Sequence, residues 1–392
     1  MEFTNMQKLR TTAKVLLIVA AMSFFATEYA SAQSLVGPAV RTEVKVLSPE
    51  TTYKFSLGNP NLNPVITALA FSNDKNTFLV GGDNHMIYFG NANEGVDSRT
   101  GKAVERATFQ RAQEFEALED WVRAIAVNPA VPTEIAALSQ NGQIVVKDLG
   151  TDSKRNIDSN LRGAHAMDYS PNGKVLAVCG FDSYVVFYDA VSLESLTKWK
   201  TPGESSTTLK FSPDGRLFAL GGRDGVIRVW NTEDGKTLAD FALTNAATQD
   251  NPNPTTQRAR AVCFSPSGSL VAAAGDANQI MVWDLTTGKR AAALNVDGRK
   301  IYSLVFCDET TLAAGDSVND VTVWNIPEQK MIAIGQGRKK GSKDNEASHS
   351  NESKNAYTLG HTGTVSALIY DSARKTLFSG SFDTTVIKWQ LP

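Results

Sequence analysis

The 392-residue chain lacks the features that define several classes of protein. Three cysteines are too few for a small scaffold held together by disulfide bonds. Its 39 lysines and arginines nearly balance its 41 aspartates and glutamates, so charge points to no nucleic-acid partner. One apolar run, at residues 15–26, covers only about half of the ~20 residues that a membrane-spanning helix needs, which excludes a polytopic membrane protein.

Motifs that carry chemistry are also missing from the sequence. It contains no His-Glu-x-x-His zinc motif, no Cys-x-x-Cys pair and no Gly-x-Ser-x-Gly nucleophile turn. The glycine-rich segment 335–341 lacks the Lys-Ser/Thr ending and the strand-to-helix context of a phosphate-binding loop. We therefore predict a non-enzymatic protein that holds neither a cofactor nor a metal ion.

The N-terminus has the three parts of a secretory signal peptide. Basic residues at positions 8, 10 and 14 precede the apolar run, and a triplet of small residues follows it at 30–32. We predict a signal peptide at 1–32 and cleavage near Ala32, giving an extracytoplasmic (periplasmic or secreted) protein without stable membrane insertion. A flexible segment is expected at 33–42. A buried N-terminal helix or a membrane anchor is the alternative.

The clearest positive signal is an internal repeat. Each copy begins with an apolar run that ends in an anchor residue, and these anchors are Phe71, Val127, Tyr169, Phe211, Phe264, Phe306 and Tyr370. Five copies carry an aromatic residue 18 or 19 positions later: Tyr188, Trp230, Trp283, Trp324 and Trp389. The commonest step between anchors is 42 residues. Seven copies with this period predict an all-β, seven-bladed β-propeller.

Turn residues divide each copy into short strands. Ser-Pro-x-Gly turns at 170–173, 212–215 and 265–268 separate the first strand from the second. The residue three positions before the anchor is always small, as expected where the innermost strands crowd around an axis. These residues are Ala68, Ala124, Ala166, Thr208, Ala261, Ser303 and Ala367. We predict four-stranded antiparallel blades that are narrow at the centre.

The repeat resembles the WD-repeat β-propellers over residues 43–392. Trp283-Asp284 is the dipeptide that names the family, and Gly360-His361 is similar to its glycine–histidine pair. The resemblance implies a structural hydrogen-bond network in the last blade, formed by His361, Ser379, Asp383 and Trp389. It also implies that an N-terminal strand closes the ring. We assign that strand to 52–57, whereas the run 44–47 could form a hairpin with it or belong to a degenerate blade.

Three long connections are expected on one face of the ring. They lie at 108–120, 243–257 and 335–360, each between the last strand of a blade and the first strand of the next. The first has the composition of a short amphipathic helix, and residues 335–358 are polar and of low complexity, which predicts disorder. Insertions on one face of a propeller often mark the binding face, although drift in exposed loops would produce the same pattern.

The same face receives the residues just before each first strand. Several are basic or aromatic, which are types enriched at binding hot spots. The predicted partner-binding residues are Trp121, Arg123, His165, Arg258, Arg260, Lys300 and Tyr302. The alternative is a set of solvated rim charges around one packed tryptophan. His165 alone is better explained as a hydrogen-bonding residue than as a catalyst.

Together these observations predict an exported, monomeric, non-enzymatic scaffold that binds a protein or peptide. One alternative is an extracytoplasmic propeller enzyme, a hydrolase or a dehydrogenase, with its site at the channel mouth. The inner strands offer it only one acid, Asp168. A purely structural domain without a fixed partner is the other alternative. Cys179, Cys263 and Cys307 fall in separate predicted strands, so buried free thiols are expected unless two strands bring a pair together.

Overall fold

The computed structural model describes residues 44–47, 49–54, 64–72, 77–96, 103–111, 118–203, 205–245, 255–337 and 360–391. All of them belong to one compact unit, Val44–Pro392. The predicted signal peptide, the segment 33–42 and most of the predicted loop 335–358 lie outside the described residues, so these three predictions remain expectations.

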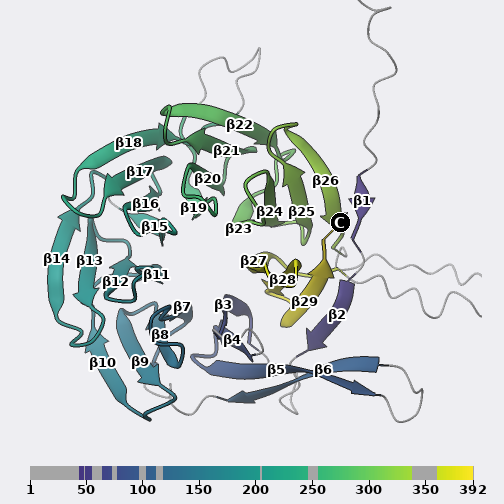
Figure 1. Ribbon diagram of the computed structural model, residues 1–392, viewed down its shortest axis with the longest axis horizontal. Coiled ribbons are helices and arrows are strands. Elements are labelled where there is room, and N and C mark those ends of the chain that lie inside the picture. The colour runs from purple at the N-terminus through teal and green to yellow at the C-terminus, as the bar shows by residue number, and fades with distance from the viewer. Residues whose placement is uncertain are drawn as a thin grey trace, which may run out of the picture. The chain divides into compact units, whose positions relative to one another are not determined.

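The strands of this unit form seven sheets arranged in a ring (Figure 1). Blade 1 consists of β3 (Ile66–Phe71), β4 (Thr77–Gly82), β5 (Ile87–Val96) and β6 (Ala103–Arg111). Blade 2 consists of β7 (Val122–Val127), β8 (Glu134–Ser139), β9 (Gln143–Asp148) and β10 (Lys154–Asp158). Blade 3 consists of β11 (Ala166–Tyr169), β12 (Val175–Cys179), β13 (Tyr184–Asp189) and β14 (Ser195–Lys200).

The remaining four blades follow the same order. Blade 4 consists of β15 (Ser206–Phe211), β16 (Leu217–Gly222), β17 (Val226–Asn231) and β18 (Thr237–Ala242). Blade 5 consists of β19 (Ala259–Phe264), β20 (Leu270–Gly275), β21 (Gln279–Asp284) and β22 (Lys289–Asn295). Blade 6 contains β23 (Ile301–Phe306), β24 (Thr311–Asp316), β25 (Val321–Asn325) and β26 (Lys330–Gly335). Blade 7 contains β27 (Val365–Asp371), β28 (Thr376–Ser381) and β29 (Thr385–Gln390).

The first strand of each blade contacts the first strand of the next, and β27 contacts β3 to complete the circle. The predicted seven-bladed propeller with antiparallel, mostly four-stranded blades is therefore confirmed.

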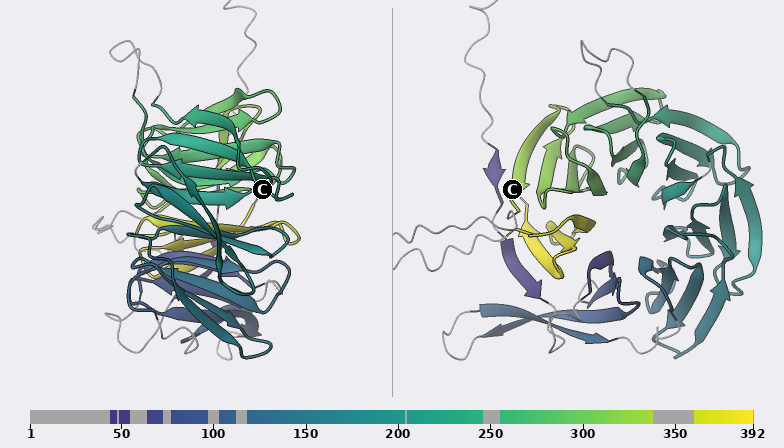
Figure 2. Two further views of the ribbon diagram at one scale, coloured as in Figure 1. Left: turned by 90° about the vertical axis from the view of Figure 1, so that its left-hand side faces the viewer. Right: turned by 180° about the vertical axis from the view of Figure 1, so that it is seen from behind.

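Ring closure occurs in the last blade, where β2 (Pro49–Lys54) pairs antiparallel with β29. Figure 2 shows, from behind, the purple β2 beside the yellow strands of blade 7. The prediction that an N-terminal strand closes the ring is confirmed, but the strand begins three residues earlier than expected. Its pairing with β29 ends at Lys54, and residues 55–57 lie outside the described part of the chain.

The run 44–47 does not form a hairpin with β2. Its strand β1 (Lys45–Val46) pairs in parallel with β26 and becomes a fifth strand of blade 6. Leu47 is buried beside Trp389, and its amide donates a 2.8 Å hydrogen bond to the carbonyl of Ile334. The chain thus runs along the outer edge of blade 6 before it enters blade 7, and both expected placements of this run were wrong.

Blade 1 differs from the others in the length of its outer hairpin. Strands β5 and β6 pair continuously from Tyr88 opposite Arg111 to Val96 opposite Ala103. Residues 108–111 are therefore strand, so the connection expected at 108–120 starts only after Arg111, and residues 112–117, where the short helix was expected, lie outside the described part of the chain. Val104, Thr108 and Phe109 are residue types that favour strands.

Close approach between blades explains why their inner parts carry small residues. A Cβ added to Gly81 would lie 2.5 Å from the side chain of Val122 on the next blade. One added to Gly315 would lie 2.5 Å from both Ser303 and Val365. These distances are shorter than real side chains tolerate, so glycine allows the sheets to converge.

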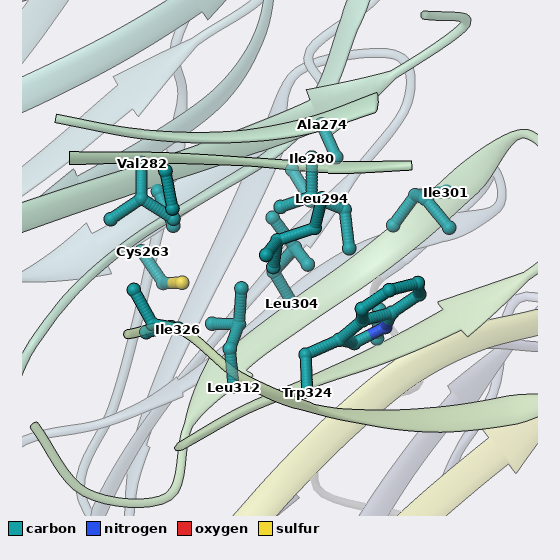
Figure 3. Packing of buried hydrophobic residues seen from close by; sticks show 14 of the residues in the cluster. Cys263, Ala274, Ile280, Val282, Leu294, Ile301, Leu304, Leu312, Trp324 and Ile326 are labelled. Atoms are coloured by element: carbon teal, nitrogen blue, oxygen red, sulfur yellow. The ribbon is translucent and has the colours of Figure 1, made fainter. Parts of the chain in front are cut away.

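The aromatic residues of the third strands fill the space where the blades diverge. Figure 3 shows this for blades 5 and 6, where Trp324 lies among Leu294, Ile301 and Leu312. Trp230, Trp283 and Trp389 are also buried. Blade 2 places Lys147 at the equivalent position, buried, with its ammonium group donating to the carbonyl (3.0 Å) and carboxylate of Asp152. A charged residue replaces the indole there because a nearby carboxylate satisfies it.

The predicted network of blade 7 is present as a chain of hydrogen bonds. The indole Nε1 of Trp389 donates to Ser379 Oγ at 2.8 Å, and that oxygen lies 2.7 Å from His361 Nε2. His361 Nδ1 lies 3.1 Å from Asp383 Oδ2 and 2.9 Å from Thr385 Oγ1. Burial alone would raise the pKa of Asp383, but hydrogen bonds from His361 and Thr385 lower it. Thr385 is a fifth member that the sequence did not reveal.

In two other blades, different residues serve as partners for a buried indole or a buried charged group. In blade 6, Ala314 replaces the serine, and the indole of Trp324 donates instead to Thr322 Oγ1 at 3.0 Å. In blade 4, Asp224 occupies the turn position of Asp383 and binds the buried guanidinium of Arg228 at 2.6 Å. The indole of Trp324 and one Nη of Arg228 therefore keep partners although the repeat has diverged, whereas Arg228 Nε, also buried, makes no hydrogen bond with the described residues.

Candidate functional site

The seven residues four positions before the anchors meet at one mouth of the central channel. They line a single cavity of about 510 Å³, and they are Thr67, Arg123, His165, Thr207, Arg260, Tyr302 and Ser366. The repeat period places one such residue at the start of each first strand, and the ring brings the seven starts together.

Five of the seven predicted binding residues line this cavity, namely Arg123, His165, Arg258, Arg260 and Tyr302. The other two lie outside its lining. The side chain of Trp121 is 43% exposed, and that of Lys300 is exposed as well.

Arg299, the residue before Lys300, binds Asp316 and Asp320 at 3.1 and 2.9 Å. Burial raises the pKa of Asp316 to about 6, against the opposing effects of its hydrogen bonds and of Arg299.

Arg123 and His165 form the first half of the site. The Nη2 atom of Arg123 lies 2.8 Å from Nδ1 and 3.0 Å from Nε2 of the His165 ring. Burial, and then the positive charge of Arg123, lowers the pKa of His165 to about 3. The imidazole is therefore neutral at physiological pH and can accept a hydrogen bond from the guanidinium. Such a histidine is a poor general acid or base near pH 7.

Arg258, Arg260 and Tyr302 form the second half. Arg260 Nε donates to Asp276 Oδ1 at 2.6 Å, and its guanidinium carbon lies 4.4 Å from the centre of the Tyr302 ring. Arg258 Nε lies 3.5 Å from the other oxygen of the same carboxylate. Burial, and then the neighbouring Arg260, lowers the pKa of Arg258, while Asp276 opposes that effect. Two arginines thus share one acid.

Sequence reasoning missed the residues at the turns between second and third strands. Phe181, Arg223, Asp276 and Phe382 lie at these turns. Phe181 and Phe382 are 44% and 41% exposed, and both line the cavity. The His165 ring meets Phe181 edge to face at 5.5 Å, and Tyr302 meets Phe382 at 6.4 Å. The signal was available, because Phe181, Arg223 and Phe382 each directly precede an aspartate in the sequence.

Asp168, the acid expected on an inner strand, is paired with a base, and the structure adds Asp371 at the end of β27. Asp168 Oδ1 accepts a 2.7 Å hydrogen bond from Lys210 Nζ, and Oδ2 accepts a 3.0 Å bond from the amide of Phe211. Lys210 lines both the first cavity and a second one of about 640 Å³ at the opposite end of the channel. Within the described residues, no group of histidine, cysteine and acidic side chains could hold a metal ion.

The three cysteines are buried free thiols, and Cys263 and Cys307 line the second cavity. Burial raises the pKa of each thiol, that of Cys307 to about 12. They are therefore protonated and weakly nucleophilic at neutral pH. Among the described elements there is no helix long and apolar enough to cross a membrane.

Comparison with known families identifies the repeat. The family model described as WD domain, G-beta repeat matches residues 158–189, 194–231, 253–284 and 353–390. The β-propeller therefore contains four segments that match WD40 repeats. Three of the matches end at or just after the tryptophan of a third strand, in blades 4, 5 and 7, and the first ends after Tyr188 in blade 3.

The relatives of this propeller have diverse names. It is 29% identical to the meiotic recombination protein rec14 of Schizosaccharomyces pombe over 30% of the chain and 36% of that protein. It is 26% identical to the small ribosomal subunit protein RACK1 of Drosophila melanogaster over 40% of the chain and 49% of that protein. It is 24% identical to the B-type cell cycle switch protein ccs52A of Medicago truncatula over 66% of the chain and 48% of that protein.

The chain therefore spans less than half the length of each of these three relatives. WD40 propellers typically serve as scaffolds for protein interactions, and the fold suggests a protein partner. Fold similarity does not identify that partner.

Proposed function

We propose that this propeller is an exported, non-enzymatic scaffold that captures a protein partner at the channel mouth lined by Arg123, His165 and Arg260. The observation that supports it most strongly is the convergence of arginines and exposed aromatic rings around one cavity. Arginine and aromatic residues contribute most of the binding energy at many protein interfaces. A peptide segment of the partner would have a recess to enter and rings to pack against.

The charge of the site provides the test. The double variant R123E/R260E is expected to abolish partner capture from the extracytoplasmic fraction, because it reverses charge on opposite sides of the mouth. Its melting temperature should stay close to that of the wild type. If the charge reversal next to Asp276 impairs folding, the neutral variant R123Q/R260Q takes the place of R123E/R260E in the capture experiment. The matched control is R290E, a reversal at an exposed position on β22. Capture that is unchanged in both double variants contradicts the proposal.

Export is proposed from the N-terminal sequence alone. We expect the mature protein to begin at Gln33, because the small residues at 30–32 match a signal-peptidase site. Intact-mass measurement of protein expressed from its full-length gene in its native host would show this directly. A mass that retains Met1 in most of the molecules would contradict export by cleavage.

A further inference from the structure

We infer that the channel mouth binds the carboxylate of an acidic peptide segment of the partner, with Arg123 and Arg258 as the residues that contact it. This inference rests on the proposed function and specifies the chemistry of the partner. It depends on the charge balance of the mouth, on a donor without an acceptor, and on the aromatic rings around the rim.

The charge balance of the mouth is positive. Arg123, Arg258 and Arg260 line the cavity, and no aspartate or glutamate is among the described residues that line it. Lys210 also lines it, but this lysine is paired with Asp168. Beyond the lining, Arg223 adds a positive charge near Arg258, and Asp120 and Asp276 supply negative ones. Among the described residues, the cavity lining therefore carries three arginines and no acid, and at the turns around it Asp83 and Asp276 offset only part of this charge, which leaves an excess that a bound anion would neutralise.

Arg258 has a hydrogen-bond donor without an acceptor. Its Nε atom is buried and makes no hydrogen bond with the part of the chain that the structure describes. The nearest acid, Asp276, lies 3.5 Å away and already accepts the 2.6 Å bond from Arg260. The side chain of Arg258 is 31% exposed and lines the cavity, so a carboxylate there can reach its guanidinium and add an acceptor that Asp276 does not fully supply.

Arg123 faces a weak acceptor. Its Nη2 atom contacts the His165 ring, which is neutral, at 2.8 and 3.0 Å. Burial lowers the pKa of the Arg123 guanidinium, and the carboxylate of Asp120 opposes that effect. An ionised carboxylate accepts a stronger hydrogen bond than a neutral imidazole does, so Arg123 would gain by contacting one.

The rim favours a peptide over a small free anion. Phe181 and Phe382 expose more than two fifths of their surface beside the cavity, and Tyr302 stacks under Arg260. An apolar residue next to the acid could pack on these rings. A cavity of about 510 Å³ is within the usual range for sites that enclose one or two side chains. The overall charge of −2 does not favour a polynucleotide.

The test uses two labelled octapeptides that differ only in two residues, glutamate in one and glutamine in the other, on either side of a phenylalanine. Fluorescence anisotropy with the full mature protein is expected to show at least a tenfold preference for the glutamate peptide. R258Q and R123Q should each weaken its binding roughly ten- to hundredfold. R290Q, on the outer strand β22, should leave it unchanged. Added salt should weaken binding.

Equal affinity for the two peptides overturns the carboxylate site. If R123E/R260E still loses partner capture in that case, the docking proposal stands and only its chemistry is wrong. A glutamate preference that R258Q removes supports the site, even if capture proves independent of this face and the docking proposal fails. Displacement of the peptide by a single-stranded oligonucleotide at lower concentration than by excess unlabelled peptide also overturns the inference.

Discussion

Replacement of Trp389 by alanine is expected to lower the free energy of unfolding by ~3–5 kcal/mol. The indole is fully buried, and a Cβ added to Gly335 on the neighbouring blade would lie only 2.6 Å from its ring. Alanine would leave a cavity between blades 6 and 7 where the ring closes. It would also remove the donor to Ser379 Oγ, which the network of His361 and Asp383 positions.

Chemical denaturation monitored by circular dichroism would measure this loss. W389F separates the two contributions, because it keeps most of the ring but loses the N–H, and we expect a cost of about 1–3 kcal/mol. V191A is the control, since Val191 is 78% exposed and its replacement should cost less than about 0.5 kcal/mol. A cost below about 1 kcal/mol for W389A would mean that this indole does not hold the blades together.

Removal of β2 is expected to have the second large effect. A mature chain that starts at residue 55 would lose the five register pairs that β2 makes with β29. At roughly 0.2–1 kcal/mol per cross-strand pair, the loss is about 1–5 kcal/mol. The exposed edge of β29 would also invite pairing between molecules, so self-association should accompany the lower stability.

The control for this truncation is a chain that starts at residue 49. It loses β1, whose two residues pair with β26, but keeps the whole of β2. We expect the longer chain to stay monomeric and to unfold at a higher denaturant concentration than the shorter one, as seen by light scattering and denaturation. Equal stability of the two chains would show that β2 does not close the ring.

The seven blades could be predicted because the repeat fixes the distance between anchor and indole. Trp230 and Trp283 stand 19 residues after their anchors, and this spacing requires the same three strands in each blade. The pairing of β1 with blade 6 could not be predicted, because a two-residue parallel pairing leaves no periodic pattern. The long β5–β6 hairpin was missed because its extension belongs to blade 1, and the pattern shared with the other blades does not include it.

The cavity at the channel mouth could be predicted for the same reason as the blades. Arg123, His165 and Arg260 occupy one position of the repeat, so the ring brings them together. Lys300 lies outside the lining with its side chain exposed, while Arg299 before it binds Asp316 and Asp320. Phe181 and Phe382 were missed because no strand pattern marks an aromatic residue on a turn, although each directly precedes an aspartate in the sequence.

The central claim is that the partner docks at the mouth where the seven first strands begin. Its most direct test is calorimetric titration of the purified captured partner into the wild-type propeller, R123E/R260E and R290E. The account predicts that affinity falls at least a hundredfold in R123E/R260E and is unchanged in R290E. Equal affinity in all three proteins, with all three folded, would contradict it.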